Sequence, residues 1–173
     1  MKVLISLLLS IVCISPLAQP SDTKGMDGYV EFADLSAAYG EPKVQIDLGE
    51  KLLRFVGKMD QDKEAAEIFN KLKAVRVEVY NVNQNTGPAI AVVDKVTAEL
   101  RSRSWEPVVI VTEGKERVRI FVKLNDKVID GLVLMAVGDK DEAVFINIIG
   151  EIDPSQVAKV TKALNVDVDV KTK

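Results

Sequence analysis

Four arginines are the side chains in this sequence best suited to binding an anion. Arg101 and Arg103 lie near the end of a predicted helix, and Arg117 and Arg119 occupy alternate positions of a predicted strand. If the helix end lies beside that strand, the guanidinium groups would form a local basic patch able to hold a phosphate or a carboxylate. The simpler interpretation is a solvent-exposed strand face, because such a face shows the same alternation.

Carboxylates are the other groups that could do chemistry, and the chain has 26 of them. An acid–base pair needs two carboxyl groups about 5–10 Å apart across a cleft, one of them with a raised pKa. No motif in the sequence selects such a pair. Asp139, Asp141 and Glu142 share one short loop, but they are too few and wrongly ordered for a calcium loop. We therefore predict no catalytic residue, no metal site and no cofactor.

The absence of histidine excludes several classes of enzyme. Serine and cysteine hydrolases that use a histidine base, and metal sites with histidine ligands, cannot form. The only cysteine, Cys13, lies in an apolar stretch at the start of the chain. The formal net charge is −3, from 23 basic and 26 acidic residues. This balance argues against a nucleic-acid-binding protein, which needs a surplus of positive charge.

The first residues have the pattern of a secretory signal. Lys2 is followed by an apolar run of about 12 residues at 3–14, and a polar stretch begins at Gln19. The run is short for a membrane-spanning helix, which needs ~20 residues. We predict a signal peptide over 1–18 and a periplasmic or secreted protein. Cleavage after position 15 and lipidation of Cys13 are alternatives, and only lipidation would place the chain at a membrane.

The rest of the chain predicts a flexible lead-in over 19–28 and one domain over 29–173. Residues 75–79 alternate strictly between apolar and polar, and 43–49 alternate similarly, as half-buried strands do. Helices are predicted at about 52–56, at 65–72 and from Pro88 to about Arg103. A meander follows over 108–112, 117–124, 128–137 and 143–149. Asp153 and Pro154 then begin a last predicted helix, and 166–170 resemble an edge strand or a loose tail.

These elements predict an α+β fold. Short turns between successive strands of the meander require antiparallel neighbours, because parallel strands need a longer crossover. We therefore expect an antiparallel sheet of about five strands. The predicted helices at 65–72 and after Pro154 each carry a single apolar stripe, so we expect the helices to pack mainly on one face of the sheet.

Several short motifs resemble a known bacterial family. They are Gly-Tyr-Val-Glu-Phe at 28–32, Tyr-Gly-Glu-Pro-Lys-Val at 39–44, Leu-Gly at 48–49 with Leu-Leu at 52–53, and Gly-Glu-Ile-Asp-Pro at 150–154. They resemble exported proteins classed as domain of unknown function 4252. The resemblance implies a bacterial envelope or secreted protein, often with a lipoprotein-type signal, and it implies no catalytic residues. The chain departs from the lipidated members at Cys13, which follows a valine.

The leading functional hypothesis is a non-catalytic domain that binds a protein or an envelope component. An open face or edge of the sheet would receive the partner. Tyr29, Tyr39 and Phe121 are candidate anchors, together with the four arginines. A carboxylate-based hydrolase or a small-ligand-binding protein of the periplasm is the alternative. A regulatory partner of a membrane signalling system is a third hypothesis.

Overall fold

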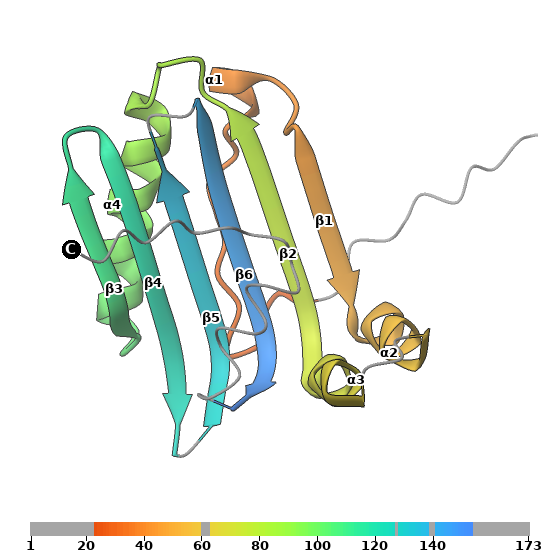
Figure 1. Ribbon diagram of the computed structural model, residues 1–173. Coiled ribbons are helices and arrows are strands. Elements are labelled where there is room, and N and C mark those ends of the chain that lie inside the picture. Colours follow the sequence, from red (N-terminus) through yellow and green to blue (C-terminus); the bar gives the residue numbers. More distant parts are fainter. Residues whose placement is uncertain (1–22, 60–62, 127, 139–140, 154–173) are drawn as a thin grey trace, which may run out of the picture.

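Six antiparallel strands form one sheet in the computed structural model, which describes residues 23–59, 63–126, 128–138 and 141–153. The strand order across the sheet is β1-β2-β6-β5-β4-β3 (Figure 1). The strands are β1 (Val44–Gly49), β2 (Leu72–Asn81), β3 (Glu106–Glu113), β4 (Glu116–Asn125), β5 (Val128–Val137) and β6 (Glu142–Ile152).

The sheet has one strand more than the approximate number expected from the sequence. Residues Val44–Gly49 alternate as predicted, and they pair with β2 at the edge opposite the meander. Sequence periodicity predicts that a segment forms a strand, but it does not predict which strand it pairs with. The edge position of β1 therefore does not follow from its sequence. The meander itself lies where it was predicted, with β5 at Val128–Val137.

The helices lie on both faces of the sheet, which corrects the expectation of a mainly one-sided cover. Helix α4 packs on one face, here called the α4 face, and α2 and α3 pack against the end of the opposite face near Leu72. A single apolar stripe shows that a helix buries one side, but it does not select the face of the sheet. The helices are α1 (Ser36–Tyr39), α2 (Glu50–Met59), α3 (Lys63–Lys71) and α4 (Gly87–Ser102).

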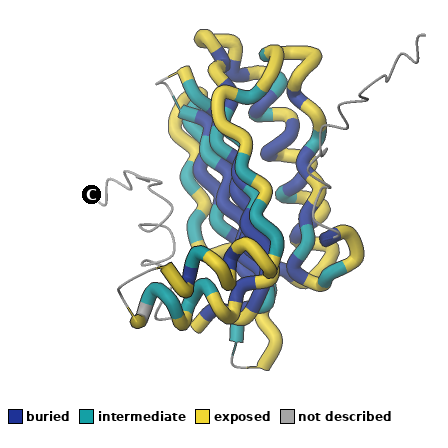
Figure 2. The backbone as a smooth tube through the Cα atoms, turned by 90° about the vertical axis from the view of Figure 1, so that its right-hand side faces the viewer, coloured by how far each residue is buried: buried dark blue, intermediate teal, exposed yellow. Residues whose placement is uncertain are grey.

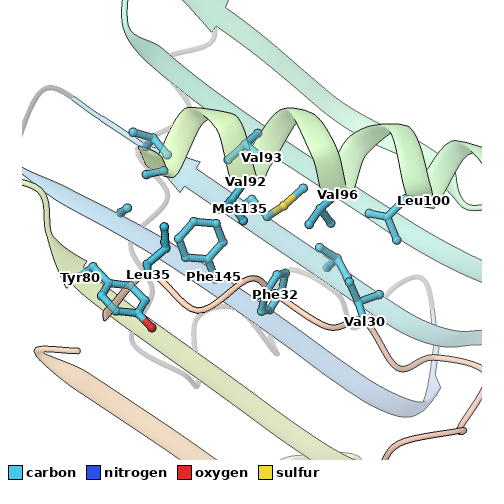
Figure 3. Packing of buried hydrophobic residues seen from close by; sticks show 14 of the residues in the cluster. Val30, Phe32, Leu35, Tyr80, Val92, Val93, Val96, Leu100, Met135 and Phe145 are labelled. Atoms are coloured by element: carbon cyan, nitrogen blue, oxygen red, sulfur yellow. The ribbon is translucent and has the colours of Figure 1, made fainter. Parts of the chain in front are cut away.

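Each face of the sheet contributes to its own apolar core. On the α4 face, Phe145 and Met135 pack against the buried residues Val93 and Val96 of α4 (Figure 3). On the opposite face, the strand register aligns aliphatic side chains from all six strands. The middle row of that face contains Ile46, Val77, Ile146, Leu134, Ile120 and Val109. The central strands are consequently buried along most of their length (Figure 2).

The segment before α1 crosses the α4 face without forming a strand. Its backbone is bound by the fully buried side chain of Asn147 on β6. The Oδ1 atom of Asn147 accepts a hydrogen bond from the Val30 N–H at 3.0 Å, and its Nδ2 atom donates to the Gly28 carbonyl at 2.9 Å and to the Leu132 carbonyl at 3.3 Å. The Asn147 side chain thus supplies hydrogen bonds to buried backbone groups of the crossing segment, which is not paired as a strand.

Gly28 lies directly against Gly131 of β5 in this crossing. A Cβ atom at Gly131 would lie 2.7 Å from the Gly28 Cα and 2.8 Å from the Trp105 Cη2 atom. Trp105 is 3% exposed and belongs to the core on the α4 face. The three residues make a close contact in which only glycine fits at two positions.

Some predicted segments lie outside the described residues: the signal peptide at 1–18, the last helix from Pro154, the tail at 166–170 and Asp139. None of the described helices has the length and apolar character needed to cross a membrane.

Candidate functional site

Three of the four predicted arginines interact electrostatically, with Arg119 of β4 influenced by Arg117 of the same strand and by Arg101 of α4. Arg119 on β4 is 7% exposed although it carries a charge. Its guanidinium donates to the Val118 carbonyl at 3.0 Å, to the Thr112 hydroxyl at 2.9 Å and to the Val111 carbonyl. These bonds fix Arg119 against the backbone of the edge strand β3.

Arg101 and Arg117 complete this set, here called the arginine group. Burial lowers the pKa of the Arg119 guanidinium, and the positive charges of Arg117 and Arg101 lower it further, whereas Asp94 opposes the shift. Arg117 donates to the carbonyls of Gly114 and Glu116, each at 2.8 Å. No member of the group forms an ion pair with a described carboxylate. The group is therefore a local excess of positive charge that an anion would stabilise.

Arg103, the fourth predicted arginine, makes contacts within the fold. It forms an ion pair with Glu99 at 3.2 Å and donates to the Tyr29 carbonyl at 3.2 Å. It therefore ties the end of α4 to the segment that crosses the α4 face.

The edge strand β3 borders the arginine group. It pairs with β4 on one side and has no strand on its other side among the described residues. Val108 is 58% exposed and Ile110 is 45% exposed, and Ile110 is the register partner of Arg119. Pro107 lacks a backbone N–H, and a register shift separates Pro107 from Val109, so the first residues of β3 are poorly suited to strand pairing. The regular part that remains begins at Val109.

The three predicted aromatic anchors are engaged within the fold. Phe121 is 0% exposed in the core beneath α4. The Tyr39 hydroxyl donates to the Asn85 carbonyl at 2.7 Å and accepts from the Ala89 N–H at 3.0 Å, which ties it to the first turn of α4. Tyr29 is half-buried, with the Arg76 guanidinium 5.0 Å from its ring centroid. All three side chains therefore make contacts within the domain.

Tyr29 and Tyr80 belong to a polar cluster along β2. Burial, together with a hydrogen bond to Glu31, raises the pKa of Tyr29 to about 12. Burial and the negative charge of Glu78 raise the pKa of Tyr80 to about 12, and the Tyr80 hydroxyl donates to Glu78 at 3.0 Å. Arg76 donates to the Val30 carbonyl at 3.0 Å, so the cluster also holds the crossing segment.

The raised tyrosine pKa values predict a loss of stability at high pH. Because an unfolded tyrosine titrates near 10, the folded chain binds more protons than the unfolded chain between pH 10 and about 12. The free energy of unfolding should therefore fall as the pH rises through this window. A tyrosinate absorbance titration should show two residues ionising near 12. Tyr80→Phe should remove one of them, and two transitions near 10 in the folded chain would contradict the assignment.

Among the carboxyl groups that the structure describes, Glu31 and Asp34 have clearly shifted pKa values, and both shifts are downward. The Tyr29 hydrogen bond lowers the pKa of Glu31, and the backbone N–H of Ser36 lowers the pKa of Asp34. A carboxylic acid catalyst needs the opposite shift. These two groups therefore do not support a carboxylate-based hydrolase.

A second exposed feature, on α2, did not emerge from the sequence. Leu52, Phe55 and Met59 are 46%, 58% and 69% exposed, while Leu53 and Gly57 of the same helix are buried. A helix with one covered side needs only one apolar stripe. The adjacent pair Leu52 and Leu53 already spans more than one stripe, and this excess was the signal available in the sequence.

Comparison with known proteins supports the resemblance noted in the sequence. The family described as domain of unknown function 4252 (DUF4252) matches residues 39–160. The chain belongs to the DUF4252 family. The match includes the arginine group, β3 and α2, so both exposed features lie within the DUF4252 region. No curated protein and no solved structure matches the chain.

Proposed function

We propose that this DUF4252 protein is an exported, non-catalytic binding domain that holds an extended acidic segment of a partner protein along β3. The observation that carries the proposal is the arginine group beside an edge strand with exposed Val108 and Ile110. An added strand gains main-chain hydrogen bonds from the edge, and side chains on alternate positions supply specificity.

The register of the sheet predicts which part of the partner meets the arginines. Ile110 and Thr112 are the cross-strand partners of Arg119 and Arg117, so these four side chains lie on the same face of the sheet. A segment added outside β3 would place every second side chain on that face as well. Carboxylates at those positions would be attracted by the arginine group, whose members have no ion-pair partner among the described residues. Apolar side chains there would cover Ile110.

Export is supported by the first residues of the sequence. The short apolar run after Lys2, followed by a polar stretch, has the order of a cleavable secretory signal. The partner would then be a periplasmic, secreted or envelope protein. N-terminal sequencing of the exported protein should find a chain that begins at Gln19, or at Pro16 for the alternative cleavage, and an intact Met1 in the cytoplasm would contradict export.

Site-specific photo-crosslinking tests the binding edge. A photoreactive amino acid at Ile110 should give a covalent product with another protein in the producing cell. The same amino acid at Gln45, an exposed position of the opposite edge strand β1, should not. Arg117→Glu should reduce the yield at least about tenfold, because it replaces an attraction by a repulsion. A product that is equally abundant from both positions, or a homodimer alone, would contradict the proposal.

The acidic character of the partner can be tested with defined peptides. An extended peptide of alternating valine and glutamate should bind the purified chain more tightly than one of alternating valine and lysine. Arg117→Glu should remove this preference, whereas Arg54→Glu on the exposed side of α2 should leave it unchanged. Equal binding of the two peptides to the unmodified chain would show that the arginine group does not select acidic over basic peptides.

A further inference from the structure

The exposed surface of α2 consists of two parallel rows of side chains. Leu52, Phe55 and Met59 form the apolar row, at positions i, i+3 and i+7. Such positions lie above one another along a helix. The row extends over nearly the whole length of α2, and its members become more exposed toward the end of the helix. An exposed apolar row of this length is typical of an interaction surface.

A row of basic side chains runs beside the apolar row. Lys51, Arg54 and Lys58 each precede one member of the apolar row by a single residue, and all three are exposed. One residue turns the helix by about 100°. The basic row therefore flanks the apolar row along its full length. Arg54 forms an ion pair with Glu50, while the two lysines form none with the described carboxylates.

We infer that α2 docks on an anionic membrane surface, with the apolar row at the boundary between headgroups and acyl chains and the basic row on the headgroup phosphates. Helices that lie in the membrane interface combine large apolar side chains on one side with Lys and Arg on the polar side. Juxtaposed basic residues add affinity for anionic lipids. The inference does not depend on the proposed function of β3.

The position of α2 in the fold leaves it accessible to a flat surface. Helix α2 directly follows the edge strand β1, whereas β3 is the opposite edge of the sheet (Figure 1). The buried side of α2, at Leu53 and Gly57, packs on α3 and the sheet. The apolar row therefore faces away from the domain, and a domain docked through α2 would keep β3 free.

Charge complementarity favours a lipid surface over a protein groove. A groove that receives a helix encloses its apolar row on both sides. Here one side of the row is lined by three long cations, which suit a plane of phosphates. On the other side of the apolar row lies Val56, which is half-buried, and beyond Val56 is the side of α2 that packs on the domain. The exposed flank of the apolar row thus carries only basic side chains. A partner of α2 therefore needs negative charge along the length of the helix.

Vesicle flotation tests this inference with residues 19–173, which retain every described residue and omit the apolar run that would itself bind lipid. The chain should float with phosphatidylcholine vesicles that contain phosphatidylglycerol, and much less with phosphatidylcholine alone. The double variant Phe55→Ser/Met59→Ser should lower the vesicle-bound fraction at least about tenfold on the anionic vesicles. Lys51→Glu/Lys58→Glu should lower it and remove its salt dependence.

Matched variants separate lipid binding from general effects of apolar exposure. Val108→Ser/Ile110→Ser removes two apolar side chains of similar exposure from β3, and it should leave flotation unchanged. Circular dichroism of each variant verifies the fold. A wild-type chain that stays in the soluble fraction, or an α2 double variant that floats as well as the wild type, would overturn the inference. Loss of flotation in the β3 variant would assign the membrane contact to the other edge.

Discussion

Asn147→Leu should lower the free energy of unfolding by about 3 kcal/mol or more. Leucine has a similar volume, but it leaves the Val30 N–H and the Gly28 carbonyl without the partner that Asn147 supplies in the core. Each buried backbone group left unsatisfied costs about 1–3 kcal/mol. Urea unfolding followed by circular dichroism measures the change.

A surface asparagine provides the control for this variant. The Asn125 side chain donates to Asp130 at 2.8 Å, but both residues are accessible to water. Asn125→Ala should therefore cost less than about 1 kcal/mol, since water replaces the lost bond. If Asn147→Leu were as mild as the control, the crossing segment would not depend on the amide. Its contacts through Val30 and Phe32 would then be sufficient.

Gly131→Ala should destabilise the chain by about 3 kcal/mol, an unusual effect for the addition of one methyl group. The new Cβ would lie 2.7 Å from the Gly28 Cα and 2.8 Å from the Trp105 Cη2 atom. Overpacking a core costs about 1–3 kcal/mol, and backbone is less able to move than a flexible side chain. Thermal unfolding measures the change, and the single Trp105 also reports a shift of its surroundings in fluorescence.

Gly87→Ala is the matched control for the same chemical change. Its Cβ would have Asn85 Oδ1 as nearest neighbour, at 3.9 Å, and it lies at the start of α4. Alanine is favoured over glycine in helices by up to about 1 kcal/mol, so this variant should be neutral or more stable. Equal effects at the two glycines would show that Gly28 and Trp105 yield to the added methyl group.

The meander and α4 could be predicted from the sequence because their signals are local. Alternation in Glu116–Asn125 and the apolar spacing in Gly87–Ser102 depend on neighbours within a few positions. Asn147 gave no such signal, because its partners Gly28 and Val30 are more than a hundred residues away. Nothing near position 147 distinguishes a buried amide from an exposed one.

The candidate site shows the same limit on a smaller scale. Arg117, Arg119 and Phe121 occupy alternate positions, so the sequence predicts that they share one face of β4. That face is core at Phe121, beneath α4, and carries Arg117 and Arg119 of the arginine group at the start of the strand. The extent to which α4 covers this face determines which side chains of β4 are accessible to a partner. Periodicity within the strand does not predict how far that cover extends.

The pairing of β2 with β6 has a consequence for the synthesis of the chain. Strands β3 to β6 follow one another through short turns, but Val77 of β2 pairs with Ile146 of β6. Ribosomes produce the N-terminal half first, at about 5–20 residues per second. For several seconds β2 therefore has an aliphatic face and one unpaired backbone edge with no β6 to cover them. During that interval the nascent chain offers the same kind of strand edge that β3 keeps permanently, and chaperones that bind extended apolar segments are suited to protect it.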